Sequence, residues 1–431
     1  MKKESWLIIH SALFLLGVKM EKIENWLDSR IGLNFRTGLG RMEQAIRLLG
    51  HPEKAYPTIH VTGTNGKGST VAFLQNLFDQ HQKKVGTFTS PHMETVHDRI
   101  CLNGQPISES DFSRLGEQVR KMEQNALLPQ DQLSYFEILS LIAFLYFAEQ
   151  EVDVALIEVG IGGLLDTTNV ITGSVSVITS IGLDHQETLG TTLEEIAEQK
   201  AGIFKVGSPA VIGPLPEVAR QVCRERAKEL NIDLYEYGQD FSLENKELRA
   251  RDFSWLDVEL GLSGTYQEEN AAVAVEAFLL FMERQSWNLD PSLVKKALAQ
   301  TSWAGRLEKV CDGIYLDGAH NLPAVERLVE FIKQEKGKEV LILFGALKRK
   351  DYSEMLHYLQ EELPQASLFL TSFSYGETIG EQEAGQLPFI RDYRNFLKDY
   401  LQDDNPHRLL FVTGSLYFIA EVRQFLKGEI N

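Results

Sequence analysis

Three glycines surround a lysine in the segment GTNGKGST at positions 63–70. Glycines let backbone amides approach a ligand closely, and Lys67 places a positive charge at the centre of the segment. The segment follows a strand-like run and opens a helical pattern, so the positive end of a helix dipole would face the same point. This combination predicts a phosphate-binding loop for ATP.

Each residue of the predicted loop has a chemical task. Lys67 would reach the outer phosphate oxygens, and Ser69 or Thr70 would offer a hydroxyl to Mg²⁺. An extra glycine separates the lysine from the hydroxyl, which departs from the common GxxxxGK[ST] form. An ordinary glycine-rich turn between a strand and a helix is therefore the alternative. The predicted nucleotide-binding set is Gly63, Thr64, Asn65, Gly66, Lys67, Gly68, Ser69 and Thr70.

A carboxylate and an imidazole follow two further strand-like runs. Glu158 ends the apolar run VALIEVG, where an ionised carboxylate is unfavourable unless it is paired or bound to a metal. His185 comes after the next run, and the ends of parallel strands converge on one crevice. The alternatives are a buried salt bridge for Glu158 and a loop histidine that caps a turn for His185.

Lys200 lies late in the helical pattern TLEEIAEQKAGIF. Its neighbours three and four positions earlier are Ala197 and Ile196, so the usual acidic partner on a helix is absent. A lysine near a helix carboxyl end is also favoured by the helix dipole, and a solvated side chain is the alternative to a role in the site.

The elements that must position these residues alternate along the chain. From about residue 57, short β-branched runs and helical patterns follow one another, which predicts βαβ units and a mostly parallel sheet. The predicted strands are Thr58–Val61, Val85–Thr89, Ala155–Val159 and Val175–Ser180. The predicted helices are Ser69–Gln82, Tyr135–Phe147 and one opened by Thr192, with Glu195 completing a capping box.

A second α/β series follows an interval of different character. Residues 232–262 predict irregular β structure, and a helix is expected near Asn270–Arg284. After Trp303 the predicted strands are Gly313–Leu316, Glu339–Phe344, Ser367–Ser372 and Arg408–Thr413, with helices at Ala324–Gln334 and at the end of the chain. We therefore predict an α/β protein with an ATP-binding P-loop domain over 20–299, containing a mostly parallel sheet, and a smaller Rossmann-like α/β domain over 300–431.

The composition limits the class of protein. The 431 residues are 43% hydrophobic and 24% charged, as in globular proteins, and the net charge of −18 disfavours nucleic acid and anionic lipid as partners. Anionic ligands would therefore need basic groups concentrated in the site. Three widely spaced cysteines, at 101, 223 and 311, argue against a disulfide framework or zinc site and fit a reducing cytoplasm.

The first 19 residues resemble a signal peptide only in part. Two lysines precede an apolar run that is too short to span a bilayer and has no small-residue cleavage site after it. We expect Met20 to be the physiological start, or residues 1–19 to be a poorly specified extension.

The motifs together resemble the folylpolyglutamate synthase/dihydrofolate synthase family of the Mur ligase superfamily. The similarity is not confined to the loop. It covers about residues 30 to 420, and its motifs occur in the family order. Its motifs are SPH at 90–92, IEVGIGG at 157–163, DTTN at 166–169, LDH at 183–185, KAGI at 200–203, NAA at 270–272, WAGRLE at 303–308, LDGAHN at 316–321 and TGS at 413–415. The resemblance implies a Mur-ligase-like fold and ATP-dependent ligation of L-glutamate to a folate or pteroate carboxylate through an acyl phosphate.

The resemblance also implies residue roles. Ser90, Glu158 and His185 would bind Mg²⁺, with K⁺ as a possible second cation. Asn270, Arg306 and His320 would contact ATP. Asp317 and Ser415 would hold glutamate, and Asp166 would contact the folate side. The catalytic set is Lys67, Lys200, Asp317 and His320. For Arg306, a buried structural ion pair is the alternative, and Lys348 is equally well explained as a solvated loop lysine.

Two positions deserve separate expectations. By resemblance, Lys200 is N6-carboxylysine, which requires a neutral amine and is helped by a lowered pKa. Leu164 stands where many bacterial relatives have a basic residue, which removes one contact to an anionic substrate.

The sequence disfavours two other functions. A Mur-type ligase of cell-wall precursors normally carries an added N-terminal domain, and only about 43 residues separate Met20 from Gly63. A non-catalytic nucleotide-binding module would leave Lys200, Arg306 and Asp317 without a shared purpose. We expect a cytoplasmic monomer with small-molecule substrates, in which Asp317 and His320 approach the loop when the domains close around Gln300–Ala304.

Overall fold

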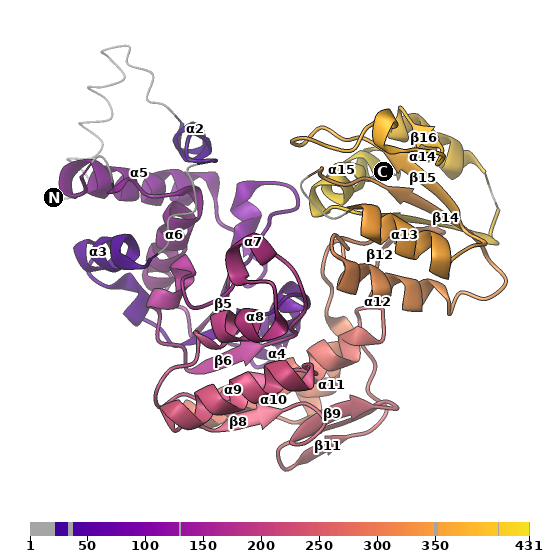
Figure 1. Ribbon diagram of the computed structural model, residues 1–431. Helices are drawn as coiled ribbons and strands as arrows, with labels where there is room; N and C mark the ends of the chain where they lie inside the picture. Colours follow the sequence, from indigo (N-terminus) through magenta and orange to yellow (C-terminus); the bar gives the residue numbers. More distant parts are fainter. Residues whose placement is uncertain (1–21, 33–37, 129–130, 349–351, 404, 431) are drawn as a thin grey trace, which may run out of the picture.

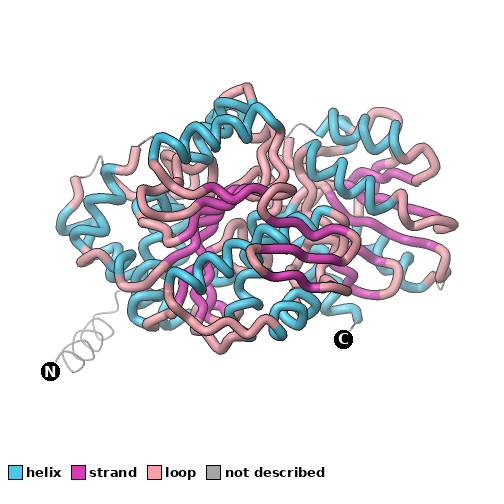
Figure 2. The backbone as a smooth tube through the Cα atoms, turned by 90° about the horizontal axis from the view of Figure 1, so that it is seen from below, coloured by secondary structure: helices cyan, strands magenta, loops and turns pink. Residues whose placement is uncertain are grey.

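The computed structural model describes residues 22–32, 38–128, 131–348, 352–403 and 405–430. The described residues form two α/β parts, each built on its own sheet, and a small antiparallel sheet belongs to the first part. Figure 1 shows the part of the chain after residue 300 as a distinct body beside the larger first part, and Figure 2 shows the strands of the molecule with helices packed around them. The predicted extension, residues 1–19, lies outside the described residues.

The first sheet has eight strands in the order β4-β3-β2-β5-β1-β6-β7-β8. The six strands from β2 to β8 in this order are parallel, and the β3–β4 hairpin adds an antiparallel edge. The strands are β1 Thr58–Thr62, β2 Val85–Phe88, β3 Ile100–Leu102, β4 Gln105–Pro106, β5 Val154–Glu158, β6 Val175–Ile178, β7 Ala210–Ile212 and β8 Leu234–Glu236.

Both faces of this sheet are covered, since alternate side chains of each strand point to opposite faces. On one face pack α2 Ile23–Asp28, α3 Gly40–Leu48, α5 Glu109–Ala126 and α6 Tyr135–Glu149, with α8 Leu193–Ala201 and α9 Glu217–Leu230 beside them. The short elements of this part are η1 Pro52–Lys54, η2 Val96–Arg99, η4 Thr167–Val170 and α7 Gln186–Leu189.

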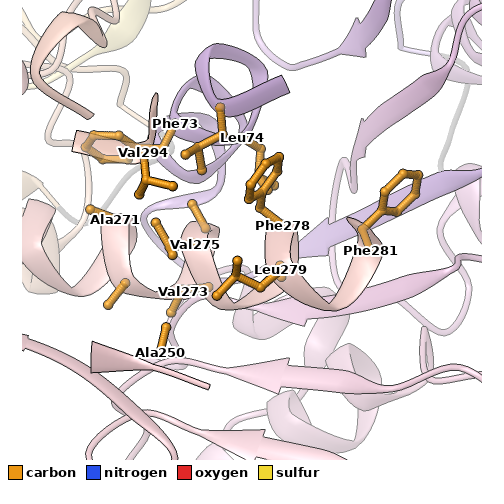
Figure 3. Close-up of a cluster of buried hydrophobic side chains, with 14 of the residues drawn as sticks. Phe73, Leu74, Ala250, Ala271, Val273, Val275, Phe278, Leu279, Phe281 and Val294 are labelled. Carbon is orange, nitrogen blue, oxygen red and sulfur yellow. The ribbon is translucent and has the colours of Figure 1, made fainter. Parts of the chain in front are cut away.

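The other face is covered by α4 Lys67–Gln80, α10 Tyr266–Arg284 and α11 Ser292–Gln300. Figure 3 shows Phe73 and Leu74 of α4 gathered with Val275 and Phe278 of α10 in one buried cluster. The helix that follows the phosphate loop is therefore anchored in the core, which fixes where the loop begins.

A three-stranded antiparallel sheet lies on the far side of α10. Its strands are β9 Phe241–Glu244, β10 Glu247–Ala250 and β11 Phe253–Trp255. Buried residues of β9 and β10 belong to the same core cluster as α10. This sheet corresponds to the irregular β structure that the sequence predicts for 232–262.

The third sheet has six strands in the order β12-β13-β17-β14-β15-β16, and all but β12 are parallel. The strands are β12 Glu308–Cys311, β13 Ile314–Leu316, β14 Glu339–Phe344, β15 Ser367–Thr371, β16 Phe389–Ile390 and β17 Arg408–Thr413. Helices α12 Leu322–Ile332 and α13 Tyr352–Glu362 cover one face, and α14 Tyr393–Gln402 and α15 Leu416–Ile430 cover the other; η5 is Glu381–Glu383.

The α/β fold class is confirmed, and the bounds of β14 and β17 agree with the sequence prediction. The capping box at α8 is present, because Thr192 Oγ1 accepts from the Glu195 amide at 3.2 Å. None of the helices within the described ranges is long and apolar enough to cross a membrane.

One buried acid in α10 predicts a pH-dependent stability. The side chain of Glu276 is buried, and no side chain among the described residues donates a hydrogen bond to its carboxylate. Burial raises the pKa of Glu276 from 4.5 to about 7, partly opposed by attraction to Arg251 and reinforced by Asp240 and Glu283. Between pH 4.5 and about 7, the Glu276 carboxyl group is ionised in the unfolded chain but still protonated in the folded chain. The free energy of unfolding therefore falls as the pH rises through this range, and Glu276 lowers it most above pH 7.

We therefore expect Glu276→Gln to raise the melting temperature at pH 8 and to leave it nearly unchanged at pH 4.5. The penalty removed at pH 8 is about 3 kcal/mol at most. Thermal unfolding at both pH values measures it, with Glu225→Gln on the exposed side of α9 as the matched control. Equal shifts at the two pH values would contradict the assignment.

Candidate active site

The predicted phosphate loop lies between β1 and α4. Gly66 takes a positive φ of 86° directly before the first residue of α4, Lys67. A Cβ atom at Gly66 would lie 2.3 Å from Oδ1 of Asn270. The loop therefore packs against α10 so closely that position 66 requires glycine.

Residues after β6 hold the other side of the loop. The Asn65 amide donates to Ser180 Oγ at 2.9 Å, and the Gly182 amide donates to Thr64 Oγ1 at 3.0 Å. Lys67 Nζ donates to the Gly63 carbonyl at 2.8 Å, which keeps its charge over the loop.

Ser69 and Thr70 do not line the cavity at the loop. Both are buried at the start of α4, and Ser69 Oγ accepts from Gln267 Nε2 at 3.3 Å. The assignment of either hydroxyl to Mg²⁺ stays a prediction that would require the helix start to rearrange.

A polar cavity of about 130 Å³ lies above the loop. It brings together side chains that are far apart in the sequence, from both α/β parts. Its wall includes Ser90, Glu158, His185, Lys200, Arg306 and His320 together with loop residues 63–68. We call it the loop cavity.

Two ionisable side chains, Glu158 and Lys200, are buried in the wall of the loop cavity. Burial raises the pKa of Glu158, opposed first by attraction to Lys67. Burial lowers the pKa of Lys200 to about 7, and repulsion from Lys67 adds to the shift. Lys200 is 3% exposed, so the solvated alternative for this lysine is wrong.

The predicted metal ligands line one cavity but form no complete cage. The Ser90 amide donates to Glu158 Oε2 at 3.3 Å, and His185 stands at the N-cap position of α7 with a positive φ of 51° but makes no side-chain capping hydrogen bond there. Within the described ranges, no group of three or more His, Cys, Asp or Glu side chains is arranged to hold a metal ion.

A larger cavity of about 350 Å³ opens from the loop cavity, and the two share Ser90, His185 and His320. Its wall combines residues of the first part with residues of the second, namely Arg99, Ser134, Phe136, Gly160, Ile161, Asp166 and Thr167 with Leu347, Gly414, Ser415, Leu416 and Tyr417. We call it the acceptor cavity.

The two aspartates predicted to bind ligands, Asp166 and Asp317, accept hydrogen bonds from the protein's own backbone. Asp166 accepts from the Ile161 and Thr168 amides, each at 3.0 Å. Asp317 accepts from the Leu307 and Ala319 amides, each at 2.9 Å. Burial raises the pKa of both carboxyl groups.

His320 lies where the loop and acceptor cavities meet. Its Nδ1 lies 2.7 Å from the Gly318 carbonyl, which selects the tautomer with the proton on Nδ1 and orients the ring. Ser415 lies on the acceptor cavity wall. Lys348 pairs with Glu383 at 2.6 Å and lines neither cavity, in agreement with a solvated loop lysine.

A third cavity of about 510 Å³ lies on the opposite side of the loop and shares Thr64, Asn65 and Gly66 with the loop cavity. Asn270 and Tyr266 of the first part face Pro323 and Arg327 of the second across it. The three cavities thus form a continuous series along the junction of the two parts, with the phosphate loop in the middle. We call the third one the nucleotide cavity.

Side-chain contacts already join the two parts across this series. Asn65 Nδ2 donates to Asn321 Oδ1 at 3.2 Å, and Asn321 Nδ2 donates to Asp184 Oδ2 at 3.0 Å. Arg423 of α15 pairs with Glu94 at 2.7 Å. The structure therefore has His320 beside the loop. The expected movement, in which Asp317 and His320 are distant from the loop in the empty enzyme and approach it when ATP and pterin bind, stays a prediction.

Sequence reasoning gave no role to two residues of the junction. Asn321 caps α12 by accepting from the Ala324 amide at 3.0 Å, and an Asn before a proline-started helix was a visible capping signal. Arg99 lies in an ordinary-looking segment, VHDRICL, and only the folded chain brings it to the acceptor cavity.

A parallel sheet with a glycine-rich loop at its strand ends, facing a second α/β sheet across a shared cavity, defines a nucleotide-dependent enzyme of the Mur ligase type. The Mur ligase middle domain family matches residues 61–278. Dihydrofolate synthase/folylpolyglutamate synthase of Bacillus subtilis (strain 168) is 36% identical and is matched over 94% of this chain and 98% of its own length.

Two further relatives agree. Folylpolyglutamate synthase of Lacticaseibacillus casei is 34% identical over 90% of this chain and 94% of its own. The solved structure of E. coli FolC in complex with DHPP and ADP superposes with a TM-score of 0.85 at 26% identity, covering 95% of this chain and 99% of that one. The chain belongs to the folylpolyglutamate synthase/dihydrofolate synthase family of Mur ligases.

The close contact at Gly66 yields a test of the loop. We expect Gly66→Ala to weaken ATP binding by about tenfold or more, because the new Cβ must displace Asn270 and the loop together. Isothermal titration with ATP measures the change. Gly207→Ala is the matched control, since Gly207 has a similar φ of 76° and nothing within 4 Å of its Cβ position. Unchanged ATP affinity in a folded Gly66→Ala protein would reject the assigned loop.

Proposed function

We propose that this protein uses ATP to join L-glutamate to the carboxylate of a pteroate or folate acceptor, through an acyl phosphate. The observation that carries the proposal is the series of three joined cavities, with the phosphate loop between a nucleotide cavity and an acceptor cavity. Relatives named as dihydrofolate and folylpolyglutamate synthases, matched over nearly their whole length, support the same activity.

The nucleotide would lie with its base and sugar in the nucleotide cavity, near Asn270, and its phosphates on the loop. Lys67 and the start of α4 supply positive charge to the transferred phosphoryl group. Arg306 adds a guanidinium from the second part of the chain. A nucleotide domain over 20–299 and a glutamate domain over 300–431 would then each provide half of the site.

The residues at the loop cavity fit a Mg²⁺ ion that takes its remaining ligands from phosphate and water. Glu158 offers a buried carboxylate, an oxygen ligand of the kind that Mg²⁺ prefers, and Ser90 and His185 lie on the same wall. Bound there, Mg²⁺ would neutralise phosphate charge in the transition state. A further K⁺ ion remains compatible with the polar lining.

We also propose that Lys200 is carbamylated. Its pKa of about 7 leaves an appreciable fraction of uncharged amine at neutral pH, and only the uncharged amine reacts with CO₂. Carbamylation would turn the Lys200 side chain into an anion. Its repulsion from Lys67 would become attraction, and the loop cavity would gain a second carboxylate in addition to Glu158.

The chemistry requires the acceptor carboxylate to reach the loop cavity from the acceptor cavity. A carboxylate oxygen of the acceptor would attack the terminal phosphorus of ATP, giving the acyl phosphate and releasing ADP. The uncharged amine of glutamate would then attack the acyl carbon, forming the amide as phosphate leaves and the nitrogen loses a proton. His320 and Ser415 lie on the side contributed by the second part, where they would hold the incoming glutamate. Asp317 would act by fixing Leu307 and hence Arg306, since its oxygens already accept two backbone amides.

Product analysis tests the activity directly. With ATP, Mg²⁺ and glutamate, mass spectrometry should show a one-glutamate addition to dihydropteroate or to a reduced folate, and none to a UDP-muramoyl acceptor. Lys67→Ala should stay folded and lose about 10²–10³-fold in rate, the cost of removing one charged contact to a transferring phosphoryl group. Glutamate addition to the muramoyl acceptor alone, or activity of Lys67→Ala within threefold of the parent, would sink the proposal.

Lys200 requires its own test. Lys200→Ala should be inactive at saturating substrates, and added acetate or propionate should restore part of the rate by replacing the lost carboxylate. ¹³C NMR of the parent protein in ¹³C-bicarbonate should show a carbamate resonance that is missing in Lys200→Ala. An active parent sample without this resonance would rule out the modification.

A further inference from the structure

Arg99 is a buried cation on the wall of the acceptor cavity. It closes η2, is 7% exposed, and its guanidinium lies 5.6 Å from the centre of the Tyr135 ring. Its Nε donates to His92 Nδ1 at 3.0 Å. Among the described residues no carboxylate lies within ion-pair distance of it, in contrast to the equally buried Arg30, which pairs with Glu123 at 2.8 Å.

A buried guanidinium without an anionic partner is unfavourable unless a ligand supplies the anion. His92 does not compensate it, because its imidazole Nδ1 only accepts the hydrogen bond from Arg99 and supplies no negative charge. The fork of a guanidinium matches a carboxylate in two parallel hydrogen bonds. The open position beside Arg99 therefore suits a carboxylate of the acceptor.

The position of Arg99 decides which carboxylate this is. The carboxylate to be phosphorylated must enter the loop cavity, whose wall has Lys67, Lys200 and Arg306 as its cations but does not include Arg99. Arg99 lies on the acceptor cavity, yet close enough to the junction to act on the charge of Glu158. It is thus available to a second, non-reacting carboxylate a few ångströms from the reacting one.

We propose that Arg99 determines acceptor specificity by binding the non-reacting α-carboxylate of an acceptor that ends in glutamate. The inference rests on the proposed ligase function. A pteroate acceptor has only its reacting carboxylate and gains nothing from Arg99. A pteroylglutamate has an α-carboxylate next to the reacting γ-carboxylate, so Arg99 adds affinity for chain extension and not for the first addition.

The test combines two acceptors with two proteins. Pteroylglutamate and pteroyl-4-aminobutyrate present the same γ-carboxylate, and only the first has the α-carboxylate. Parent protein and Arg99→Gln are titrated with each compound in the presence of a non-hydrolysable ATP analogue, and KM and kcat are measured with their reduced forms. The parent should prefer the glutamyl compound by about 10–100-fold, the range of a charge-assisted pair. Arg99→Gln should prefer the glutamyl compound by less than threefold. The change should appear in the binding affinity and in KM, while kcat stays nearly constant.

Two further variants separate specificity from stability. Arg99→Lys should recover part of the preference, because it retains the charge without the fork. Arg30→Gln removes an equally buried guanidinium that does not line the cavity, and it should keep the parent's preference even if it lowers the melting temperature.

Each remaining outcome has a definite meaning. Equal losses for both acceptors, or a fall in kcat with dihydropteroate, would place Arg99 at the reacting carboxylate or in the framework and overturn the proposal. An unchanged preference in Arg99→Gln would overturn it as well. A parent protein that ligates glutamate to no pterin acceptor would refute the proposed function itself, and this result is distinct from a parent that is active but indifferent to the α-carboxylate.

Discussion

The carboxyl ends of β5, β1 and β6 lie side by side, and this edge of the sheet determines where the charges of the loop cavity can be. Val61 is paired with Glu158 across β1 and β5, and Thr62 is paired with Ile178 across β1 and β6. The phosphate loop leaves β1 at this edge, so Glu158 is brought beside it by strand register alone. A shift of one residue would turn Glu158 to the opposite face of the sheet, away from the loop.

A protein with a net charge of −18 must bind anions through a local excess of cations. The two parts of the chain supply it together, with Lys67 and Lys200 from the first and Arg306 from the second. The pKa of Lys200 is lowered first by burial and then further by repulsion from Lys67. Phosphate groups and an added carboxylate on Lys200 would both relieve this repulsion, so substrate binding and modification would favour the same joined arrangement.

Much of the fold could be predicted from the sequence because its signals are local. The apolar runs of β14 and β17, the glycines around Lys67 and the Thr192–Glu195 capping pair each identify an element by themselves. The site was harder, because burial and cavity lining depend on residues distant in the chain. Lys200 has no acidic residue three or four positions before it on its helix, but only the packing of α8 shows that it is buried.

The same limit explains the two aspartates expected to contact ligands. Asp166 lies on the wall of the acceptor cavity and Asp317 accepts from Leu307, the residue after Arg306, but motif position cannot say where a carboxylate points. In the folded chain each accepts from a backbone amide of a neighbouring segment and fixes its turn. Asp166 fixes Ile161 at the acceptor cavity, and Asp317 fixes Leu307 beside Arg306. Two backbone amides partly offset the unfavourable burial of each charge. A buried carboxylate can thus be as necessary to a site as a contact residue, because loops without regular hydrogen bonds need an acceptor that the backbone itself does not supply.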